Sequence, residues 1–555
     1  MPEPVGALLL HRGVSDIVAA ERYLRPQLAH LLPPDAMRDL DRAVDRIATA
    51  VRDGQTILVH GDYDVDGMTS TAMMTRVLRN LGGTVMTFIP NRMTDGYDLG
   101  DAGVRAAVAE RAALVITCDC GTSAIDPVAR LNAAGIDVII TDHHLPGGPL
   151  PAALAVLNPR RPDCAYPDKD LVAAGVAFKL AIAVTRALGG DEAFVYGLLD
   201  LVALATIADV APLRGENRVF ARHGLRMMPE SRLAGLRAMI RAAGLENKEL
   251  TAGRIGFTLA PRLNAAGRVG SAMRGVQLLL TDDEGVAMGI ARELEELNRH
   301  RQELDRETLD AARKQLDRLD LSETFGIVLA GEGWHAGVIG IVASRIVEET
   351  ARPTMLVAVE RGVGKGSGRS IPAFDLHGAL TACKQHFTRF GGHRAAAGIT
   401  LPSERIAAFA ADFNAIARER LTPDDLMTDL RIDIELPVSR ATRELIDALR
   451  AFEPYGIGNP APTFLARGVR TDAPVKRVGE SGVRTRFADA ESSIDAIAWD
   501  FAQRADRIDW TAPLDLAYRL ELDEWNGRVR VQARVADVRP AAASSGGGPQ
   551  TELRL

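Results

Sequence analysis

The 555-residue sequence has no apolar run that approaches the ~18 residues of a membrane-spanning helix. Its N-terminus also lacks the basic stretch and apolar core of a secretory signal. Cysteine is scarce, and Cys118, Cys120, Cys164 and Cys383 match neither a zinc site nor a disulfide framework. We therefore expect a cytoplasmic protein with no membrane contact, in which Cys118 and Cys120 are small residues at a strand end.

An excess of basic charge is also missing. The formal net charge is −7 at pH 7, which neither requires nor excludes a nucleic-acid partner, because steering depends on how charge is distributed. Hydrophobic residues make up 47% and charged residues 25%, as in ordinary folded proteins, so only the Ala-, Ser- and Gly-rich tail (541–555) is expected to be flexible. The length exceeds what one hydrophobic core usually supports, and roughly three to four domains are expected.

The sequence does contain a dense acidic segment directly after a predicted strand. Residues 60–67 read H-G-D-Y-D-V-D-G, so that Asp62, Asp64 and Asp66 leave one strand end together. Such a segment alone is about as often a solvated loop or a helix cap as a metal site. His60 suits a buried strand position as well as it suits a metal ligand. Asp62 lies on the same side as the other two carboxylates only if the extended geometry persists.

Three later segments repeat this pattern. Asp119, the triplet Asp142-His143-His144 and Asp209 each follow a short apolar run. Side chains just past successive parallel strands converge in space, because open α/β sheets bind ligands outside the carboxyl ends of their strands. Carboxylates packed this closely repel one another unless cations lie among them. The joint occurrence therefore favours a divalent-metal site, and the mixture of Asp and His favours Mn²⁺, with Mg²⁺ as the alternative.

Strand and helix patterns alternate through the first part of the chain. Strands are predicted at 57–60, 84–89, 114–117 and 138–141, and helices at 40–52, 69–80, 103–110 and 125–134. This alternation predicts an α/β fold with a mostly parallel sheet. The charged segment 282–319 has helical periodicity and predicts a long connecting helix. A second α/β unit follows, and short strands alternating with turns then predict a small β-barrel. The predicted division is 1–40 (N-terminal helices), 41–281 (first α/β domain), 282–320 (connecting helix), 321–425 (second α/β domain), 426–540 (barrel) and 541–555 (tail).

Taken in order, the motifs G-D-Y-D-V-D-G, C-D-C-G, D-H-H and A-T-I-A-D-V resemble those of the DHH phosphoesterase superfamily. The later segments G-W-H-A-G-V-I-G, G-S-G-R-S and G-G-H are similar to its DHHA1 companion domain. With the size, the P-R-L-N-A-A-G-R segment and the β-rich tail, the chain is similar to the superfamily's single-strand-specific 5′ to 3′ DNA exonucleases. The resemblance implies a DHH domain, a DHHA1 domain and an OB-like barrel. It also implies hydrolysis of phosphodiesters to 5′-mononucleotides in DNA repair and recombination.

The resemblance further implies roles for individual residues. A two-metal centre would be formed by Asp64, Asp66, Asp119, His143 and Asp209, with His60 and Asp62 as further candidates. Asp119 is a plausible bridging ligand, and His144 would lie beside the scissile phosphate. Two divalent ions suit this reaction, because they lower the pKa of a shared water and stabilise charge on the attacking and leaving oxygens.

Substrate contacts are expected in the second α/β domain. The glycine-rich stretch 364–370 combines approachable backbone N–H groups with Ser367, Arg369 and Ser370, which suits a phosphate. A flexible hairpin turn is the alternative. By resemblance, this stretch and the segment that contains His393 grip the end of the nucleic acid.

Other candidate contacts lie outside that domain. Tyr97 could stack on a base or be a core residue, and Arg262 and Asn264 are candidate contacts to the nucleic-acid backbone. In the predicted barrel, the basic and aromatic mixture typical of an oligonucleotide-binding fold consists of Lys476, Arg477, Arg484, Arg486, Phe487, Trp499, Trp525 and Arg528.

Two other functions stay open from the sequence. One is a related phosphoesterase acting on short RNA or nucleotide phosphates, against which the β-rich tail argues. The other is a catalytically inactive binding protein of the same architecture, which should have lost ligands that are all present here. Single-stranded DNA is the expected partner, together with a helicase and a single-strand-binding protein. We expect a monomer, because one chain supplies both the catalytic and the gripping domain.

Overall fold

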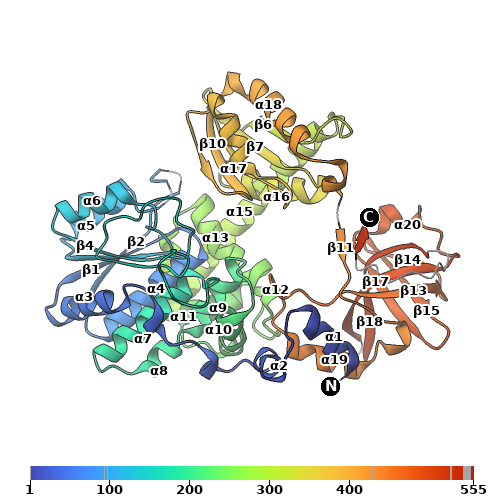
Figure 1. Ribbon diagram of the computed structural model, residues 1–555, viewed down its shortest axis with the longest axis horizontal. Helices are drawn as coiled ribbons and strands as arrows, with labels where there is room; N and C mark the ends of the chain where they lie inside the picture. The colour runs from blue at the N-terminus through green and yellow to red at the C-terminus, as the bar shows by residue number, and fades with distance from the viewer. Residues whose placement is uncertain are drawn as a thin grey trace.

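The computed structural model describes residues 2–92, 94–96, 98–427, 429–525, 528–541 and 552–554. The prediction for Tyr97 and most of that for the 541–555 tail lie outside these residues, as do the side chains of Trp525 and Arg528. Figure 1 shows three bodies: the first α/β domain, a second α/β domain carried by the long helix α15, and a β-barrel at the opposite end from the first sheet. Among the described helices, none combines the length and the apolar character needed to cross a membrane.

The first domain is built on a five-stranded parallel sheet, as the alternating pattern predicts. Its strand order is β2-β1-β3-β4-β5. The strands are β1 (Thr56–Gly61), β2 (Thr84–Phe88), β3 (Leu114–Cys118), β4 (Asp137–Thr141) and β5 (Ala155–Leu157). Ile57 and Val59 pack into one hydrophobic core and Leu58 into another, so the sheet is covered on both faces.

Helices cover both faces of this sheet: α3 (Leu40–Arg52), α4 (Val65–Asn80) and α7 (Ala173–Ala187) on one face, and α5 (Asp101–Ala109) and α6 (Ile125–Ala133) on the other. The remaining helices of the domain pack mainly against other helices; they are α8 (Glu192–Tyr196), α9 (Leu199–Ala208), α10 (Gly215–Met227), α11 (Ala234–Ala242), α12 (Ala252–Arg254), α13 (Ala260–Val269) and α14 (Met273–Leu280). The predicted helix 40–52 is confirmed. The helix predicted to begin at residue 69 begins instead at Val65, because the Asp64 carboxylate caps it and accepts the Gly67 N–H at 3.1 Å. The acidic segment therefore turns into a helix and does not continue as a strand.

A single helix, α15 (Glu284–Leu316), leads into the second α/β domain and confirms the predicted connecting helix. The sheet of that domain has the order β6-β7-β8-β10-β9. Its strands are β6 (Ile327–Glu332), β7 (Thr354–Glu360), β8 (Val363–Arg369), β9 (Arg389–Gly392) and β10 (Ala396–Pro402), and its helices are α16 (Ile339–Thr350), α17 (Leu376–Ala382) and α18 (Ile406–Arg420). Only β6 and β7 pair in parallel within this sheet.

The C-terminal domain is a small barrel, as predicted. Its sheet has the order β12-β13-β17-β18-β16-β15-β14, and pairing of β13 with β15 closes it. Its elements are β12 (Ile434–Glu435), α19 (Arg443–Leu449), β13 (Phe464–Thr471), β14 (Lys476–Val478), β15 (Gly482–Ala488), β16 (Ser493–Ala498), α20 (Ala502–Ala505), β17 (Leu514–Trp525) and β18 (Arg528–Pro540), with β11 (Asp429–Arg431) paired to β19 (Glu552–Arg554). Phe464, Phe487 and Tyr518 fill the interior.

The N-terminal segment, residues 2–36, joins two domains that are far apart in the sequence. Helix α1 (Glu3–His11) places Leu8 and Leu9 in the hydrophobic core of the barrel. Helix α2 (Ile17–Leu24) follows, and Leu28 and Leu32 then pack against the core of the first domain. In Figure 1 this segment runs from the barrel beneath α10 to the first domain. We call residues 2–36 the N-terminal strap.

Candidate metal centre and substrate groove

The acidic residues lie at the switch point of the parallel sheet. The chain leaves β1 toward β2 on one side and returns to β3 on the other, so the loops after β1 and β3 diverge and leave a crevice at the carboxyl end of the sheet. Asp62 and Asp64 follow β1, and Asp119 follows β3. Asp119 adopts φ 67° and bonds through its N–H to the Thr141 carbonyl on β4, which fixes the turn out of the strand.

Three overlapping groups of potential metal ligands meet in this crevice, and within each group the ligand atoms lie within 4.8 Å of one another. The groups are Asp62, Asp64 and Asp119; Asp66, His143 and Asp209; and Asp119, His143 and His144. The Nε2 atom of His143 lies 3.3 Å from Asp119 Oδ1 and 3.7 Å from Asp209 Oδ2. Four segments that are distant in the sequence thus bring their side chains together, as the sequence predicts.

Two further helices orient the candidate ligands Asp66 and Asp209. Asp66 accepts the N–H groups of Ala173 and Ala174, both at 2.8 Å, at the start of α7. These bonds combine with the positive end of the helix dipole to orient the carboxylate. Asp209 is the C-terminal cap of α9, and the Val210 that follows it adopts φ 58°.

The electrostatics of the crevice are those of a cation site. Burial, followed by the neighbouring carboxylates Asp64 and Asp66, raises the pKa of Asp119 and of Asp209. Burial and then Asp64 raise the pKa of Asp66 to about 7. Among the described residues, Oδ1 of Asp62 and Oδ1 of Asp119 are buried without a hydrogen-bond partner. Buried acceptors that repel one another are what a divalent cation compensates, so these residues fit a metal centre.

The two adjacent histidines differ in charge. Burial, and then the neighbouring His144, lower the pKa of His143 to about 3, so its neutral imidazole suits a metal ligand. Burial also disfavours charge on His144, but the 2.8 Å hydrogen bond between its Nδ1 and Asp142 outweighs this and raises the pKa of His144 to about 9. Asp142 is fixed in turn by the N–H groups of His143 and Thr122. At neutral pH, His143 is therefore a neutral candidate ligand and His144 is a cation.

His60 is not brought into any of these groups. It is fully buried, and burial lowers its pKa to about 4. Its Nδ1 lies 3.6 Å from Cys120 Sγ, and a Cβ on Gly103 would come within 2.6 Å of its Nε2, so its ring packs against α5. His60 thus packs among core residues outside the three ligand groups, with its Nε2 buried and without a hydrogen-bond partner among the described residues, and its role as a ligand stays a prediction.

The glycine-rich stretch 364–370 is neither a phosphate loop nor a hairpin turn. Residues 363–369 form β8, whose ladders run to β7 on one side and β10 on the other, so the backbone does not offer the free N–H array expected from the sequence. The glycines face the core: a Cβ on Gly366 would lie 2.5 Å from Ile399 Cγ1. Because side chains alternate along a strand, Lys365, Ser367 and Arg369 share the opposite face.

A groove of about 580 Å³ lies between this face and the first domain. Its lining includes Lys365, Ser367, Arg389 and His393 from the second domain and Arg92 from the first. His393, an expected contact, thus lines the groove. Gly340 in the first turn of α16 packs against Ser367 and Arg369, so the positive end of that helix also points to this region.

An arginine cluster joins the groove to the metal centre; it contains Arg369, which is predicted from the sequence, and Arg92 and Arg268, which are not. Burial, then Arg92, lower the pKa of both Arg268 and Arg369, with that of Arg268 at about 10. Within the described residues, none of these three guanidinium groups forms an ion pair with a carboxylate. Arg92 also stacks on the ring of Tyr63, between Asp62 and Asp64, at 4.9 Å. Arg92 follows β2, the strand beside β1, and this position could have indicated from the sequence that it lies near the acidic segment.

The remaining predicted contacts have partners within the protein. Arg262 pairs with Glu295 on α15. Asn264 accepts the Val65 N–H at 3.2 Å and so holds the start of α4 beside the metal centre. The Ser370 hydroxyl donates to the Phe374 carbonyl at 2.8 Å.

The match to known families agrees with this geometry. The chain matches the models for the DHH family, N-terminal domain (residues 56–206), the DHHA1 domain (323–419) and the RecJ OB domain (432–537). The parallel sheet, the ligand set at its switch point and the companion domain define a DHH phosphoesterase.

Similar proteins narrow this class. The single-stranded-DNA-specific exonuclease RecJ of Salmonella typhimurium is 35% identical over 97% of both chains, and RecJ of Thermus thermophilus is 37% identical over 97% of this chain and 75% of the relative. The crystal structure of Thermus thermophilus RecJ in complex with Mn²⁺ superimposes with a TM-score of 0.84 at 35% identity, covering 98% of this chain and 77% of that one. The chain belongs to the RecJ family.

Proposed function

We propose that this protein is a metal-dependent exonuclease specific for single-stranded DNA. It digests from the 5′ end, releases 5′-mononucleotides and acts in DNA repair and recombination. The observation that carries the proposal is the complete set of Asp and His ligands at the switch point of the sheet. The similarity to single-stranded-DNA-specific exonucleases supports the substrate, and the RecJ structures with Mn²⁺ and with Mg²⁺ support those two ions.

The residues divide the chemistry among them. Asp62, Asp64, Asp66, Asp119, His143 and Asp209 would hold two divalent ions, which supply an activated water and stabilise charge on the phosphate oxygens. His144 is charged at neutral pH, and its Nδ1 bonds Asp142, so its Nε2–H is the group that would donate a hydrogen bond to a non-bridging oxygen or protonate the leaving oxygen. Asp142 keeps that imidazole oriented.

The groove supports cleavage from an end. Arg92, Arg268 and Arg369 gather positive charge beside the acidic loop, and burial together with Arg92 lowers the pKa of both Arg268 and Arg369. Such a cluster suits a phosphate, because charge-assisted hydrogen bonds from guanidinium groups are strong and directional. Ser367 and His393 extend the same contact surface. Tyr97, Arg262, Asn264 and Ser370 stay sequence-based candidates.

The partners follow from the proposed substrate. A single strand must be produced before it can be digested, so a helicase is the expected supplier, and a single-strand-binding protein is the expected competitor or carrier. We keep the proposal of a monomer, since both the metal centre and the groove come from one chain.

Strands labelled at either end, digested with Mn²⁺, Mg²⁺ or chelator, test the proposal. We expect 5′-mononucleotides to be released from the 5′ end of single strands only, and only with metal. Double strands of the same sequence are the matched control.

The same assay addresses the alternative of a DHH phosphoesterase acting on short RNA or nucleotide phosphates. Faster turnover of RNA dinucleotides than of long DNA would contradict the proposal and favour that alternative. A protein that binds strands without cutting them under any metal condition would be an inactive relative.

A further inference from the structure

A turn of the C-terminal domain contacts the loop that follows the metal ligand Asp209. After Asp209 the chain runs through 210–214 before α10 begins. The Leu213 N–H donates to the Ile457 carbonyl at 2.7 Å. Gly458, at φ 70°, packs so closely that a Cβ there would lie 3.0 Å from Pro212 Cβ. Residues 456–459 form this turn, closed by reciprocal backbone bonds between Gly456 and Asn459, and we call it the docking turn.

The docking turn is held by hydrogen bonds of Asn459 to the C-terminal domain and to the N-terminal strap. Asn459 is almost fully buried, and its side-chain amide donates to the carbonyls of Phe452 and Pro454 at 2.7 and 2.8 Å. Its Oδ1 accepts the Tyr23 hydroxyl of the N-terminal strap. With every polar atom of its side chain bonded, Asn459 fixes the turn against the rest of the chain.

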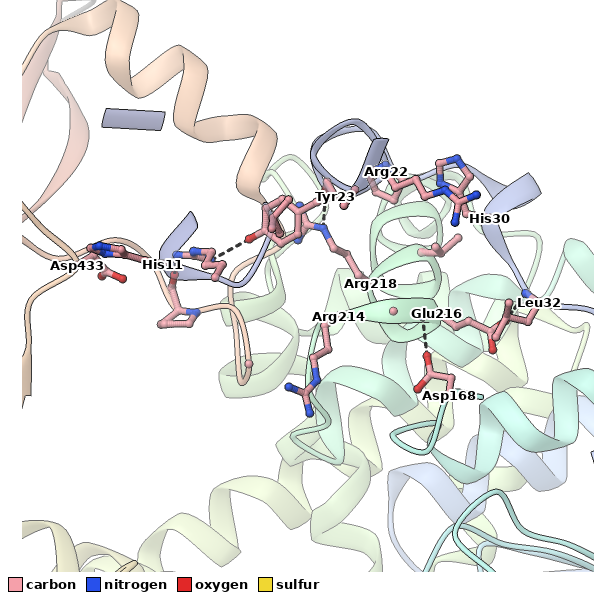
Figure 2. Close-up of a pocket in the computed structure, with 18 of the residues that line it drawn as sticks. His11, Arg22, Tyr23, His30, Leu32, Asp168, Arg214, Glu216, Arg218 and Asp433 are labelled. Atoms are coloured by element: carbon pink, nitrogen blue, oxygen red, sulfur yellow. Dashed lines mark hydrogen bonds between the residues drawn. The ribbon is translucent and has the colours of Figure 1, made fainter. Parts of the chain in front are cut away.

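Two arginines of helix α10 donate hydrogen bonds to the segments that flank the docking turn. Arg218 donates to the carbonyls of Tyr23, Ala451 and Glu453, and Arg222 donates to the Glu453 carbonyl. Figure 2 shows Arg218 reaching Tyr23 where the strap crosses α10. The strap, α10 and the barrel therefore meet at the docking turn, and its carbonyl reaches the metal-ligand loop.

The loop it contacts needs such support. Val210 is a branched residue in the left-handed region, a conformation that costs free energy and persists only when the surroundings impose it. Its side chain is 61% exposed, so its own packing does not hold the loop. Pro212 and Leu213 are the loop's anchored end: the Pro212 carbonyl accepts from Asn217, and Leu213 bonds to the turn.

We propose that the docking turn is a positioning element for Asp209, so that the C-terminal domain sets the affinity of the metal centre. This inference rests on the proposed function in treating Asp209 as a ligand. It gives the barrel a second role, in addition to the DNA binding that the sequence predicts for it. Coupling between sites is reciprocal, so metal binding also tightens the contact between the barrel and the first domain.

The variant Gly458→Ala tests this inference, because its Cβ presses on Pro212 and strains the left-handed turn. Metal binding to the full-length, metal-free protein is measured by calorimetry with Mn²⁺ alone. We expect the affinity to fall about tenfold, as when groups that orient metal ligands are lost. Turnover should fall at low Mn²⁺ and recover at high Mn²⁺, with the KM for single strands nearly unchanged.

The matched control is Gly468→Ala, at φ 62° in β13, where an added Cβ meets nothing within 4 Å. It carries the same backbone strain in the same domain but does not touch the first domain, and it should bind Mn²⁺ as the unmodified protein does. Tyr23→Phe is a gentler second variant that removes the hydroxyl, which donates to Asn459 and accepts from Arg12 of the same strap. We expect it to weaken Mn²⁺ binding in the same direction by a smaller factor.

Unchanged Mn²⁺ affinity in both folded variants would overturn the inference, as would a rise in KM for strands with unaltered metal dependence. Either result leaves the proposed nuclease intact. An unmodified chain that binds Mn²⁺ but cuts no strand would instead overturn the proposed function, while the calorimetric comparison would still decide the role of the turn.

Discussion

At the scale of single residues, burial decides the chemistry of the metal centre. Carboxylates that would be ionised and hydrated on a surface are enclosed at the end of a parallel sheet, where only hydrogen bonds and cations can compensate their charge. Asp66 and Asp142 have backbone partners, whereas Oδ1 of Asp62 and Oδ1 of Asp119 have none among the described residues. The unpartnered oxygens are those we expect to face metal ions.

Asp119→Ala should abolish metal-dependent nucleotide release, by about three orders of magnitude or more, because Asp119 belongs to two of the three ligand groups. Burial raises the pKa of this carboxyl, so its removal should leave the metal-free fold at least as stable. Release of nucleotides and thermal unfolding in chelator measure the two effects. Retained activity would refute the ligand assignment.

Removing metal should make stability fall as pH rises. Burial raises the pKa of Asp66 from 3.8 to about 7, so the folded state binds more protons than the unfolded chain between these values, and stability declines across that window. Saturating Mn²⁺ should reverse the decline and add about 2.7 kcal/mol at 100 times its Kd. Thermal unfolding from pH 5 to 8 with chelator or Mn²⁺ measures this. A flat profile in chelator would contradict it.

Arg92→Ala should raise the KM for single strands about tenfold to hundredfold with little change in kcat, as expected for one lost charge-assisted contact to phosphate. The guanidinium stacks on Tyr63 and lines the groove, so its loss acts on binding. Steady-state kinetics measure it. Arg130→Ala, at an exposed pair with Asp101 on the first domain, is the control and should leave KM unchanged.

At the scale of elements, two segments changed character between sequence and structure. The acidic segment becomes the first turn of α4, capped by Asp64, and the glycine run becomes the central strand β8. The start of α4 is capped locally by Asp64 and held from afar by Asn264, and β8 is held by its ladders to β7 and β10. The glycines of β8 are needed for close packing against Met355, Ile399 and Leu401, and not for a turn.

Gly366→Ala should therefore destabilise the protein by about 1–3 kcal/mol through overpacking against Ile399. Gly289→Ala, in α15 with nothing within 4 Å of its Cβ, should instead stabilise it by about 0.5–1 kcal/mol, as for an unhindered glycine inside a helix. Denaturant unfolding of both variants measures the contrast. Equal effects would show that β8 has room for side chains on its glycine face.

At the scale of the whole molecule, the barrel contacts both the N-terminal strap and the first domain. The N-terminal strap contributes Leu8 and Leu9 to its core, and the docking turn reaches the metal-ligand loop. Deleting the barrel would expose the apolar face of α1, so charge variants are the cleaner test of DNA binding. Lys476 and Arg484 lie directly opposite each other on β14 and β15, and Asp523 lies 3.8 Å from Arg484, so two basic side chains share one carboxylate and favour an anionic ligand.

Replacing both Lys476 and Arg484 by Ala should weaken binding to long strands and reduce the slope of log K against log salt by about 1.4, since two phosphate contacts to a single strand are lost. Hydrolysis of very short strands should change little. Binding titrations at several salt concentrations measure the slope. An equal loss of activity on long and short strands would contradict a binding role for this face.

Much of the fold could be predicted because periodicity is local. The α3 helix, the parallel sheet, the connecting helix and the barrel follow from patterns that each span a few turns or strands. The convergence of the Asp and His side chains could be predicted for a related reason, since residues at the carboxyl ends of parallel strands converge, although Asp209 comes from the end of helix α9. His60 could not be resolved in this way, because only the packing of α5 decides where its ring lies.

The sequence by itself determined the chemistry: which strand ends carry Asp and His, and therefore that a divalent-metal centre forms at the end of one sheet. Only the tertiary structure decided the contacts between distant segments, namely the arginine cluster beside that centre, the buried role of the glycine strand, and the junction of strap, α10 and docking turn. The physical reason is that a side chain's type and its strand end are local properties. Its partner, its burial and its charge state depend on residues hundreds of positions away.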